Sequence, residues 1–273
     1  MQWKKSVNFP DIPLKRFLGL TGGAILVLLP LVIVFLTSLS PQTGVTLPST
    51  FSFENYRDAW QRGDFLLAFA NSTLVALAVT AFQLITSALA GYALARLRFR
   101  GQQLILLLIL ATLVIPFQIL VIPIFILLKW GSLLNTYWAL ILPTAVSGYS
   151  IFLMRQFFVS IPAEIEEAAV IDGASRLDIL WSIMLPLARP ALVTLFLFAF
   201  IGEWNDLFKP LIFTTRPELR TVQLALAEFQ EQFTNRWPLL MAAVIIATIP
   251  VILLFLLGQK QFIRGIGTTG IKQ

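Results

Sequence analysis

The sequence predicts an all-α fold, a polytopic membrane helix bundle of six transmembrane helices that forms a single domain over residues 1–273. Two observations come from composition. Only 12% of the residues are charged, whereas a soluble domain carries about 25%, and the mean hydropathy is +0.83. The third observation is that apolar stretches of about 20 residues, the length of helix that crosses a bilayer, recur along the whole chain.

Six apolar stretches are long enough to span. The segments between them are too short for a separate soluble domain, and the first stretch lacks an alanine-type cleavage site, so we expect a retained helix rather than a signal peptide. After the fourth span we expect a loop at about 160–186, here called the acidic loop, and after the last a tail at about 259–273. The spans cover approximately residues 17–37, 66–94, 104–128, 137–157, 188–212 and 238–258.

Basic residues fall mostly on one side of the expected spans. Thirteen lie before the first span, in the loops after the second and fourth spans and in the tail, against seven on the other side. Because basic residues are retained in the cytoplasm, this bias predicts that both termini, the acidic loop and the tail are cytoplasmic. Placement at membrane edges also explains the formal net charge of +6 without a nucleic acid partner.

The residue types exclude several kinds of site. The chain has no cysteine and no histidine, so a disulfide framework, a thiolate metal site and the usual general base are excluded. We therefore predict no catalytic residue, no metal site and no cofactor bound by this chain. The sequence also lacks the G-x-x-x-x-G-K-[ST] loop that cradles nucleotide phosphates, so we do not expect this chain to hydrolyse ATP.

The acidic loop holds five of the fourteen carboxylates of this otherwise apolar chain. Pro162 suits the first turn of a helix, and the glutamates after it suit the positive end of the helix dipole. Gly173 is placed to end that helix, since glycine readily adopts the left-handed conformation. Ser175 followed by Asp178 has the spacing of a capping box and predicts a second helix. The apolar stripe expected on that helix consists of Leu177, Leu180, Trp181 and Met184.

Two interpretations of this helix, turn and helix stay open from the residues alone. Ala168 and Ala169 are small enough to let another backbone or side chain pack closely, and the glutamates offer hydrogen-bond acceptors, which indicates a docking site for a soluble partner. An amphipathic loop that covers the membrane surface is the alternative.

A longer pattern favours the docking site. The stretch EAAVIDGASRLDILWSIMLP has Glu-Ala-Ala, three residues, Gly, nine residues and then Ile-x-Leu-Pro. It resembles the EAA motif of the membrane subunits of bacterial ABC importers, which also precedes the penultimate span. GYALARLRFRGQ, LLNTYWALILP, WNDLFKPL and FIRGIGTTGIKQ resemble carbohydrate-importer permeases of the maltose-transport type, in their shorter, six-span form. The chain departs from that pattern at Lys209, where an aromatic residue is common, and at Gln273, where glycine is common.

The resemblance implies a type I ABC importer fold in the bacterial cytoplasmic (inner) membrane. It implies that the acidic loop carries a coupling helix that docks on the ATP-hydrolysing subunit, and that the C-terminal tail docks there too. The residues that match the coupling motif are Glu167, Ala168, Ala169, Asp172 and Gly173. The residues that match the tail are Gly267, Gly270 and Lys272.

The resemblance also implies partners rather than an enzymatic activity of this chain. This chain and a homologous second permease subunit would form the translocation pathway together as a heterodimer. The alternative is a homodimer of this chain. Two copies of an ABC ATPase subunit would bind ATP and Mg. An extracytoplasmic solute-binding protein would deliver the sugar or related carbohydrate or polyol.

Polar residues in the fifth span form the other candidate site. Ionisable groups inside a span usually face the bundle interior or a water-filled cavity, so we expect Trp204, Asn205 and Asp206 to line the translocation pathway. Asn and Asp side chains can hydrogen-bond sugar hydroxyls, and the indole can stack on a sugar ring. The alternative is a network at the helix end, in which Asp206 pairs with Lys209 and the Lys209 side chain reaches outward to the interface.

The remaining polar residues and prolines have structural interpretations. Asn71 and Gln83 lie in the second span and Gln118 in the third, and we expect all three to form interhelical hydrogen bonds. Pro30, Pro116 and Pro123 predict kinks in the first and third spans. The alternative function is a gradient-driven secondary transporter, which often has internal repeats, and we find none in this sequence. A membrane-embedded enzyme is a third class, without a histidine, cysteine or metal cluster to support it.

Overall fold

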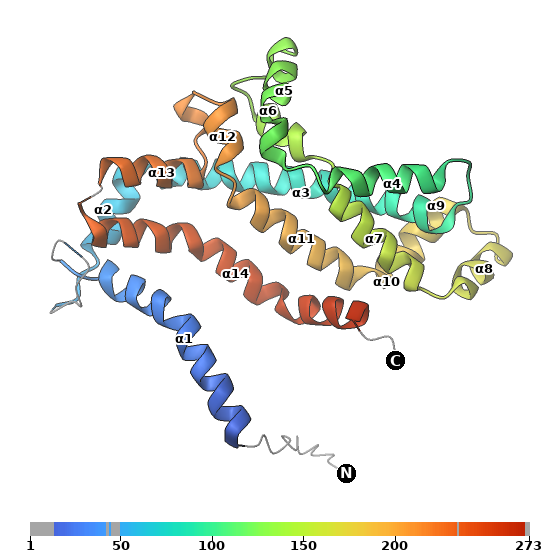
Figure 1. Cartoon of the computed structure of the whole chain (residues 1–273), viewed down its shortest axis with the longest axis horizontal. Coiled ribbons are helices and arrows are strands. Elements are labelled where there is room, and N and C mark those ends of the chain that lie inside the picture. The colour runs from blue at the N-terminus through green and yellow to red at the C-terminus, as the bar shows by residue number, and fades with distance from the viewer. Residues whose placement is uncertain (1–13, 42–43, 45–49, 234, 271–273) are drawn as a thin grey trace. The chain divides into compact units, whose positions relative to one another are not determined.

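The computed structural model describes residues 14–41, 44, 50–233 and 235–270, with side chains from residue 16 to residue 260. The secondary structure of these residues is helical, and none of them belongs to a strand (Figure 1). The all-α prediction is therefore confirmed. The chain forms two compact units. Unit 1 is Met1–Trp60 with Gln230–Ile246, and unit 2 is Gln61–Phe229 with Ala247–Gln273.

Among the described residues, three helices are long and apolar enough to cross a membrane as single helices. Pro30 lies inside the first of them and Pro250 inside the third, whereas the second contains no proline. The second is therefore the one of the three in which every residue keeps its backbone N–H for the helix ladder. These helices are Arg16–Ser38 of α1 (Leu14–Ser38), α3 (Phe65–Arg96) and Trp237–Lys260 of α14 (Trp237–Gly270).

Three further stretches of the described chain have the length and apolarity of a span but are bent. α4 (Gln102–Thr112) and α5 (Phe117–Trp130) meet at 101°, and Figure 1 shows that they run in different directions. The stretch Tyr137–Thr144 meets α7 (Gly148–Ser160) at 45°, and the stretch before α11 (Arg189–Trp204) meets α11 at 78°. The described residues thus hold three spans, or up to six if each bent pair is one span. The count of six stays a prediction.

Local chemistry explains two of the breaks. Pro116 is the N-cap of α5 with extended backbone (φ −62°, ψ 135°), so the stretch 104–128 forms two helices rather than one kinked helix. Before α7, the Ser147 hydroxyl oxygen accepts the Ser150 N–H at 3.3 Å and caps a new helix start.

The predicted span 188–212 is also interrupted. α11 ends at Trp204, and α12 (Phe208–Phe213) begins after three intervening residues. There the Asp206 carboxylate accepts the N–H of Phe208 at 2.9 Å, which offers the backbone an alternative to a continuous helix.

The other elements are short. In unit 1, the Asn55 amide donates to Ser38 O at 3.0 Å and to Ser40 O at 2.8 Å, which fastens the end of α1 to the segment that starts α2. The remaining helices are α2 (Glu54–Arg62), α6 (Tyr137–Ile141), η1 (Leu142–Thr144), α8 (Ala163–Ile171), α9 (Arg176–Ile179), η2 (Leu180–Met184), α10 (Leu185–Leu187), η3 (Pro217–Leu219) and α13 (Val222–Gln232).

The packed centre of unit 2 consists of α3 with α7 and α11. A Cβ added at Gly91 of α3 would lie 2.9 Å from the Met154 Cβ of α7, so glycine is what lets the two helices approach this closely. One hydrophobic cluster extends from Tyr92, Met154 and Phe158 into the acidic loop, where it includes Ala169 and Ile179. The acidic loop is therefore packed on the helices of unit 2.

Candidate functional site

α8, the first helix of the acidic loop, begins and ends where the sequence signals place it. Pro162 is its N-cap. At its other end Gly173 has φ +86°, and its N–H donates to Val170 O at 3.0 Å. The N–H of Ala174 donates to Ala169 O at 3.0 Å. These two bonds around a left-handed glycine form a Schellman motif, so the predicted glycine turn is confirmed.

The second helix of the loop, α9, begins with the predicted capping box. The Ser175 hydroxyl oxygen accepts the Asp178 N–H at 3.3 Å, while the Asp178 carboxylate accepts the Ser175 N–H at 3.1 Å. The Ser175 hydroxyl also donates to that carboxylate at 2.5 Å. These bonds from Ser175, the hydroxyl first and then the backbone N–H, lower the pKa of the exposed Asp178 carboxyl below its usual value.

The apolar stripe predicted on this second helix is wrong. Leu180 and Met184 are buried in the core of unit 2, whereas Leu177 and Trp181 are 62% and 59% exposed. The stripe assumed 3.6 residues per turn, but the backbone of Leu180–Met184 forms the π-helical segment η2, whose turns are wider. The two exposed side chains belong to the surface of the acidic loop.

The five coupling residues matched by sequence do not share one face. Glu167, Ala168, Asp172 and Gly173 are exposed, whereas Ala169 is 8% exposed and packs in the hydrophobic cluster of its own chain. The structure thus leaves Ala169 little surface for a partner. That the other four bind an ATPase subunit stays a prediction.

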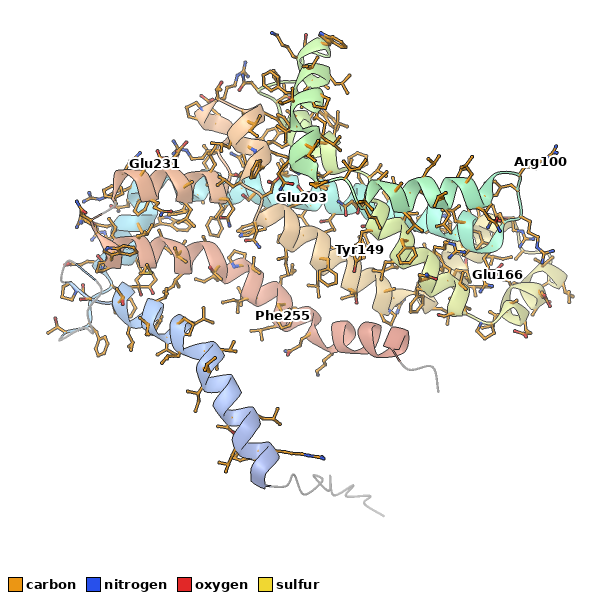
Figure 2. The ribbon with its side chains drawn as sticks, in the orientation of Figure 1. Arg100, Tyr149, Glu166, Glu203, Glu231 and Phe255 are labelled. Atoms are coloured by element: carbon orange, nitrogen blue, oxygen red, sulfur yellow. The ribbon has the colours of Figure 1, made fainter. Side chains whose placement is uncertain are left out.

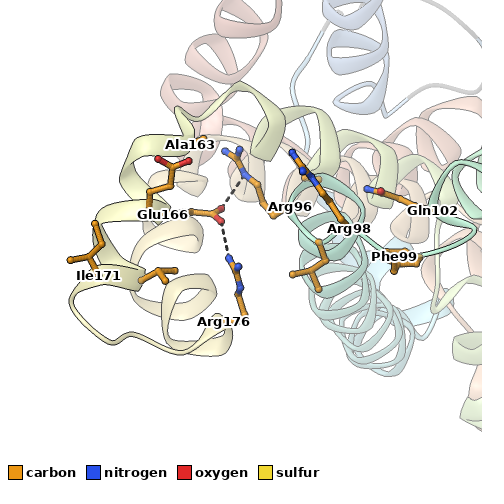
Figure 3. Close-up of a pocket in the computed structure, with 12 residues that line it drawn as sticks. Arg96, Arg98, Phe99, Gln102, Ala163, Glu166, Ile171 and Arg176 are labelled. Atoms are coloured by element: carbon orange, nitrogen blue, oxygen red, sulfur yellow. Dashed lines mark ion pairs between the residues drawn. The ribbon is translucent and has the colours of Figure 1, made fainter.

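Sequence reasoning missed the residue beside them. Glu166 is only 6% exposed and lies between two arginines (Figure 3). Its Oε1 is 3.0 Å from Arg96 Nε, an ion pair without hydrogen-bond angles, and its Oε2 is 3.7 Å from Arg176 Nη1. The only sequence signal was the arginine-rich turn after the second span.

A cleft of about 1050 Å³ opens beside this ion pair. One wall is the end of α3 and the turn after it, with Arg98 and Phe99, and the other is α8, with Ala163 and Ile171 (Figure 3). Glu167 of α8 also lines the cleft. Ile171 is 85% exposed. The acidic loop thus combines a wide opening, mixed charge and exposed apolar side chains, and exposed apolar patches mark sites that contact a protein or a membrane.

The second candidate site, at the break between α11 and α12, is an ion cluster. Glu203 on α11 lies far along the unit from Glu166 (Figure 2). It pairs with Lys209 Nζ, which is 3.4 Å from Asp206 Oδ2 and donates to Thr144 Oγ1 at 2.6 Å. The predicted pairing of Asp206 with Lys209 is confirmed. The prediction that the Lys209 side chain reaches outward is wrong, because this side chain is 2% exposed and pairs with two carboxylates inside the protein.

The neighbouring pathway candidates differ in exposure. Trp204 is 1% exposed, donates its indole N–H to Ala247 O at 3.0 Å and stacks on Phe200, so its ring is covered within its own chain. Asn205 is exposed, and its Oδ1 accepts the side-chain N–H of Gln223 at 3.2 Å. That Trp204, Asn205 and Asp206 line a pathway stays a prediction.

The interhelical hydrogen bonds expected in the second span are confirmed. The Asn71 amide donates to Glu218 O and to Arg220 O, each at 2.8 Å, and accepts from the Tyr137 hydroxyl at 2.7 Å. The Gln83 amide donates to Thr144 O at 2.8 Å.

Of the tail residues, Gly267 and Gly270 belong to the last turns of α14. Lys272 lies outside the described residues.

Comparison with known proteins adds three findings. The model of the family described as binding-protein-dependent transport system inner membrane component matches residues 83–268. The arabinooligosaccharides transport system permease protein AraQ of Halalkalibacterium halodurans is 33% identical in an alignment of 264 positions that covers 93% of this chain and 95% of that protein. The sulfoquinovosyl glycerol transport system permease protein SmoH of Agrobacterium fabrum is 34% identical in an alignment of 253 positions that covers 90% of this chain and 89% of that protein.

A solved structure gives the same result for the fold. A chain of a bacterial ABC transporter involved in the import of the acidic polysaccharide alginate superimposes with a TM-score of 0.77 and 27% identity, over 93% of this chain and 100% of that chain. The predicted resemblance and the type I ABC importer fold are thereby confirmed. The chain belongs to the family of binding-protein-dependent transport system inner membrane components.

Proposed function

We propose that this chain is a permease subunit that forms the membrane pathway of an ATP-driven importer for a sugar or related carbohydrate or polyol. Its family membership supports the importer. The substrate class is supported by the relatives, which are named for the transport of arabinooligosaccharides, sulfoquinovosyl glycerol and sn-glycerol-3-phosphate. All of these compounds carry two or more hydroxyl groups, which hydrogen-bonding side chains would recognise.

The observation that carries the proposal is the geometry of the acidic loop. Glu167 and Ala168 are exposed on α8 beside a large cleft, and the apolar side chains of Ile171 and Trp181 are exposed on the same loop. We propose that an ABC ATPase subunit covers this surface, two copies of it binding ATP and Mg and driving the transport cycle. The ATP-hydrolysing groups then belong to that subunit and not to this chain.

The complete importer also needs partners in and outside the membrane. We propose a homologous second permease that closes the pathway with this chain, and a solute-binding protein that delivers the substrate. A solved structure that shares this fold at 16% identity is that of a bacterial alginate ABC transporter in complex with its alginate pentasaccharide-bound periplasmic protein. The distribution of basic residues supports cytoplasmic placement of both termini and of the acidic loop.

The experiment is transport in proteoliposomes that contain this chain with its second permease and the ATPase, plus the binding protein. Binding-protein-dependent uptake of a labelled oligosaccharide should require ATP on the side of the ATPase and should continue when a protonophore dissipates the proton gradient. Uptake that needs the gradient and not ATP would overturn the proposal in favour of a secondary transporter.

A further inference from the structure

Two adjacent glutamates of α8 lie in opposite environments. Glu167 is exposed, whereas Glu166 is turned into unit 2. Buried carboxylates are rare unless they are paired, so the inward position of Glu166 depends on its ion pairs. The pairing partner therefore decides which part of the bundle α8 is attached to.

That partner is Arg96, the last residue of α3. The Nη2 group of Arg96 donates to Phe158 O at 2.7 Å and to Ile161 O, the carbonyls at the end of α7, while its Nε faces Glu166 at 3.0 Å. One guanidinium thus donates hydrogen bonds to two carbonyls through Nη2 and pairs by charge with the Glu166 carboxylate. A single side chain thus joins the end of α3, the end of α7 and α8.

A second arginine holds Glu166 from the other direction. Arg176 lies after the Gly173 turn, at the start of α9, with its Nη1 at 3.7 Å from the second carboxylate oxygen (Figure 3). Its side chain is 58% exposed, so solvent screens this contact more than that with Arg96, whose side chain is 13% exposed. The pair with Arg96 is therefore the main attachment.

The opposite end of α3 is attached as well. The Asn71 amide donates to two carbonyls of the segment around η3, and the Ser72 hydroxyl oxygen accepts the Val222 N–H at 2.8 Å. Residues 72 and 96 are about 36 Å apart along one uninterrupted helix at about 1.5 Å per residue. α3 thus connects the acidic loop to the start of α13.

We propose that Glu166 is a positioning residue that transmits movement of α8 to α3 through Arg96, whereas Glu167 makes contact with the ATPase subunit. This inference rests on the proposed function, since movement of α8 requires a bound ATPase. The two glutamates then have separable roles, one in binding and one in coupling.

The test compares Glu166→Gln with Glu167→Gln in the complex of both permeases, the ATPase and the binding protein. Each variant removes one negative charge from the same turn of α8 and keeps the side-chain size. Three quantities are measured: the affinity of the permeases for the ATPase in detergent, ATP hydrolysis, and substrate uptake per ATP hydrolysed in proteoliposomes.

Glu166→Gln should retain the ATPase and hydrolyse ATP, with uptake per ATP lower by about tenfold, within the usual range of coupling between sites. Glu167→Gln should weaken ATPase binding and lose hydrolysis and uptake together. The inference is overturned if Glu166→Gln transports with wild-type yield per ATP, or if it loses the ATPase as Glu167→Gln does. If the unaltered permeases bind no ATPase, it is the proposed function that fails.

A distance measurement separates loss of transmission from loss of folding. The chain contains no cysteine, so Glu164→Cys on α8 and Arg100→Cys after α3 introduce its only two thiols, and both can be spin-labelled before this chain is assembled with its partners. The distance distribution should be narrow in the unaltered complex and should broaden in Glu166→Gln while the complex stays assembled. An unchanged narrow distribution in Glu166→Gln contradicts the proposed attachment.

Discussion

Unit 2 contains two ion clusters of opposite composition. At the end of α3, one carboxylate, Glu166, lies between two arginines, one of which is largely exposed. At the break between α11 and α12, the buried Lys209 lies between two carboxylates. The first cluster joins helices far apart in sequence, whereas the second is formed mainly within residues 203–209. The difference indicates that the first is suited to link moving parts and the second to hold one bend in place.

The largest expected effect is on the second cluster. Lys209→Met leaves Glu203 and Asp206 without their cation, and a broken buried pair of this kind destabilises a protein by about 3–5 kcal/mol. Unfolding in mixed SDS micelles measures the loss. Adding Glu203→Gln to Lys209→Met should recover much of it, and failure of that recovery would show that the lysine acts through packing rather than charge.

The next effect concerns the main attachment of the first cluster. Arg96→Gln removes the ion pair to Glu166 and replaces the charged donor of two hydrogen bonds to carbonyls by a neutral one. A hydrogen bond from a charged donor contributes about 1.5–3 kcal/mol to stability. We expect a loss of about 2–3 kcal/mol in the same unfolding measurement, because glutamine keeps part of the hydrogen bonding. A loss below that of Arg176→Gln would reverse the order of the two arginines derived from burial.

A double-mutant cycle tests whether α3 links its two ends. Glu166→Gln acts at one end and Ser72→Ala at the other, where it removes the acceptor of the Val222 N–H. Independent sites this far apart add within about 0.5 kcal/mol. If α3 transmits movement, Ser72→Ala should have little further effect on uptake per ATP in the Glu166→Gln variant. The interaction energy of the cycle should then be about 1 kcal/mol. Additive effects would confine the role of Glu166 to the acidic loop.

The smallest effect is expected at the exposed arginine. Arg176→Gln removes a 3.7 Å contact from a side chain that is 58% exposed, so the loss of stability should be about 0–0.5 kcal/mol and should vanish at high salt. Unfolding at low and high ionic strength measures it. A loss that persists in high salt would show that Glu166 depends on both arginines equally.

Local chemistry was predictable from the sequence, and long-range pairing was not. Pro162, Gly173 and the Ser175 capping box act over a few residues, so their rules gave the start, turn and restart of the acidic loop correctly. Which of the two glutamates, Glu166 or Glu167, is buried and paired depends on Arg96, which lies seventy residues earlier in the sequence. Rules for neighbouring residues do not include so distant a partner.

The polar residues of the fifth span show the same boundary. A lysine near the end of an assumed continuous helix was expected to reach outward, but the helix breaks after Trp204 and turns Lys209 inward to Glu203 and Thr144. Asp206 contributes to the break, because its carboxylate accepts a backbone N–H that a continuous helix would use. This bond was not predicted because the fifth span was taken to be continuous through Asp206.

The uninterrupted length of α3 has a mechanical consequence. α3 has 32 residues and no proline, so it is a continuous helix about 48 Å long at about 1.5 Å per residue. Three other apolar stretches of the described chain are bent. A tilt of about 10° about one end of a helix of this length displaces the other end by about 8 Å. In the proposed importer, a small rotation of α3 at the acidic loop would therefore become a displacement about the size of a sugar ring at the other end of the helix.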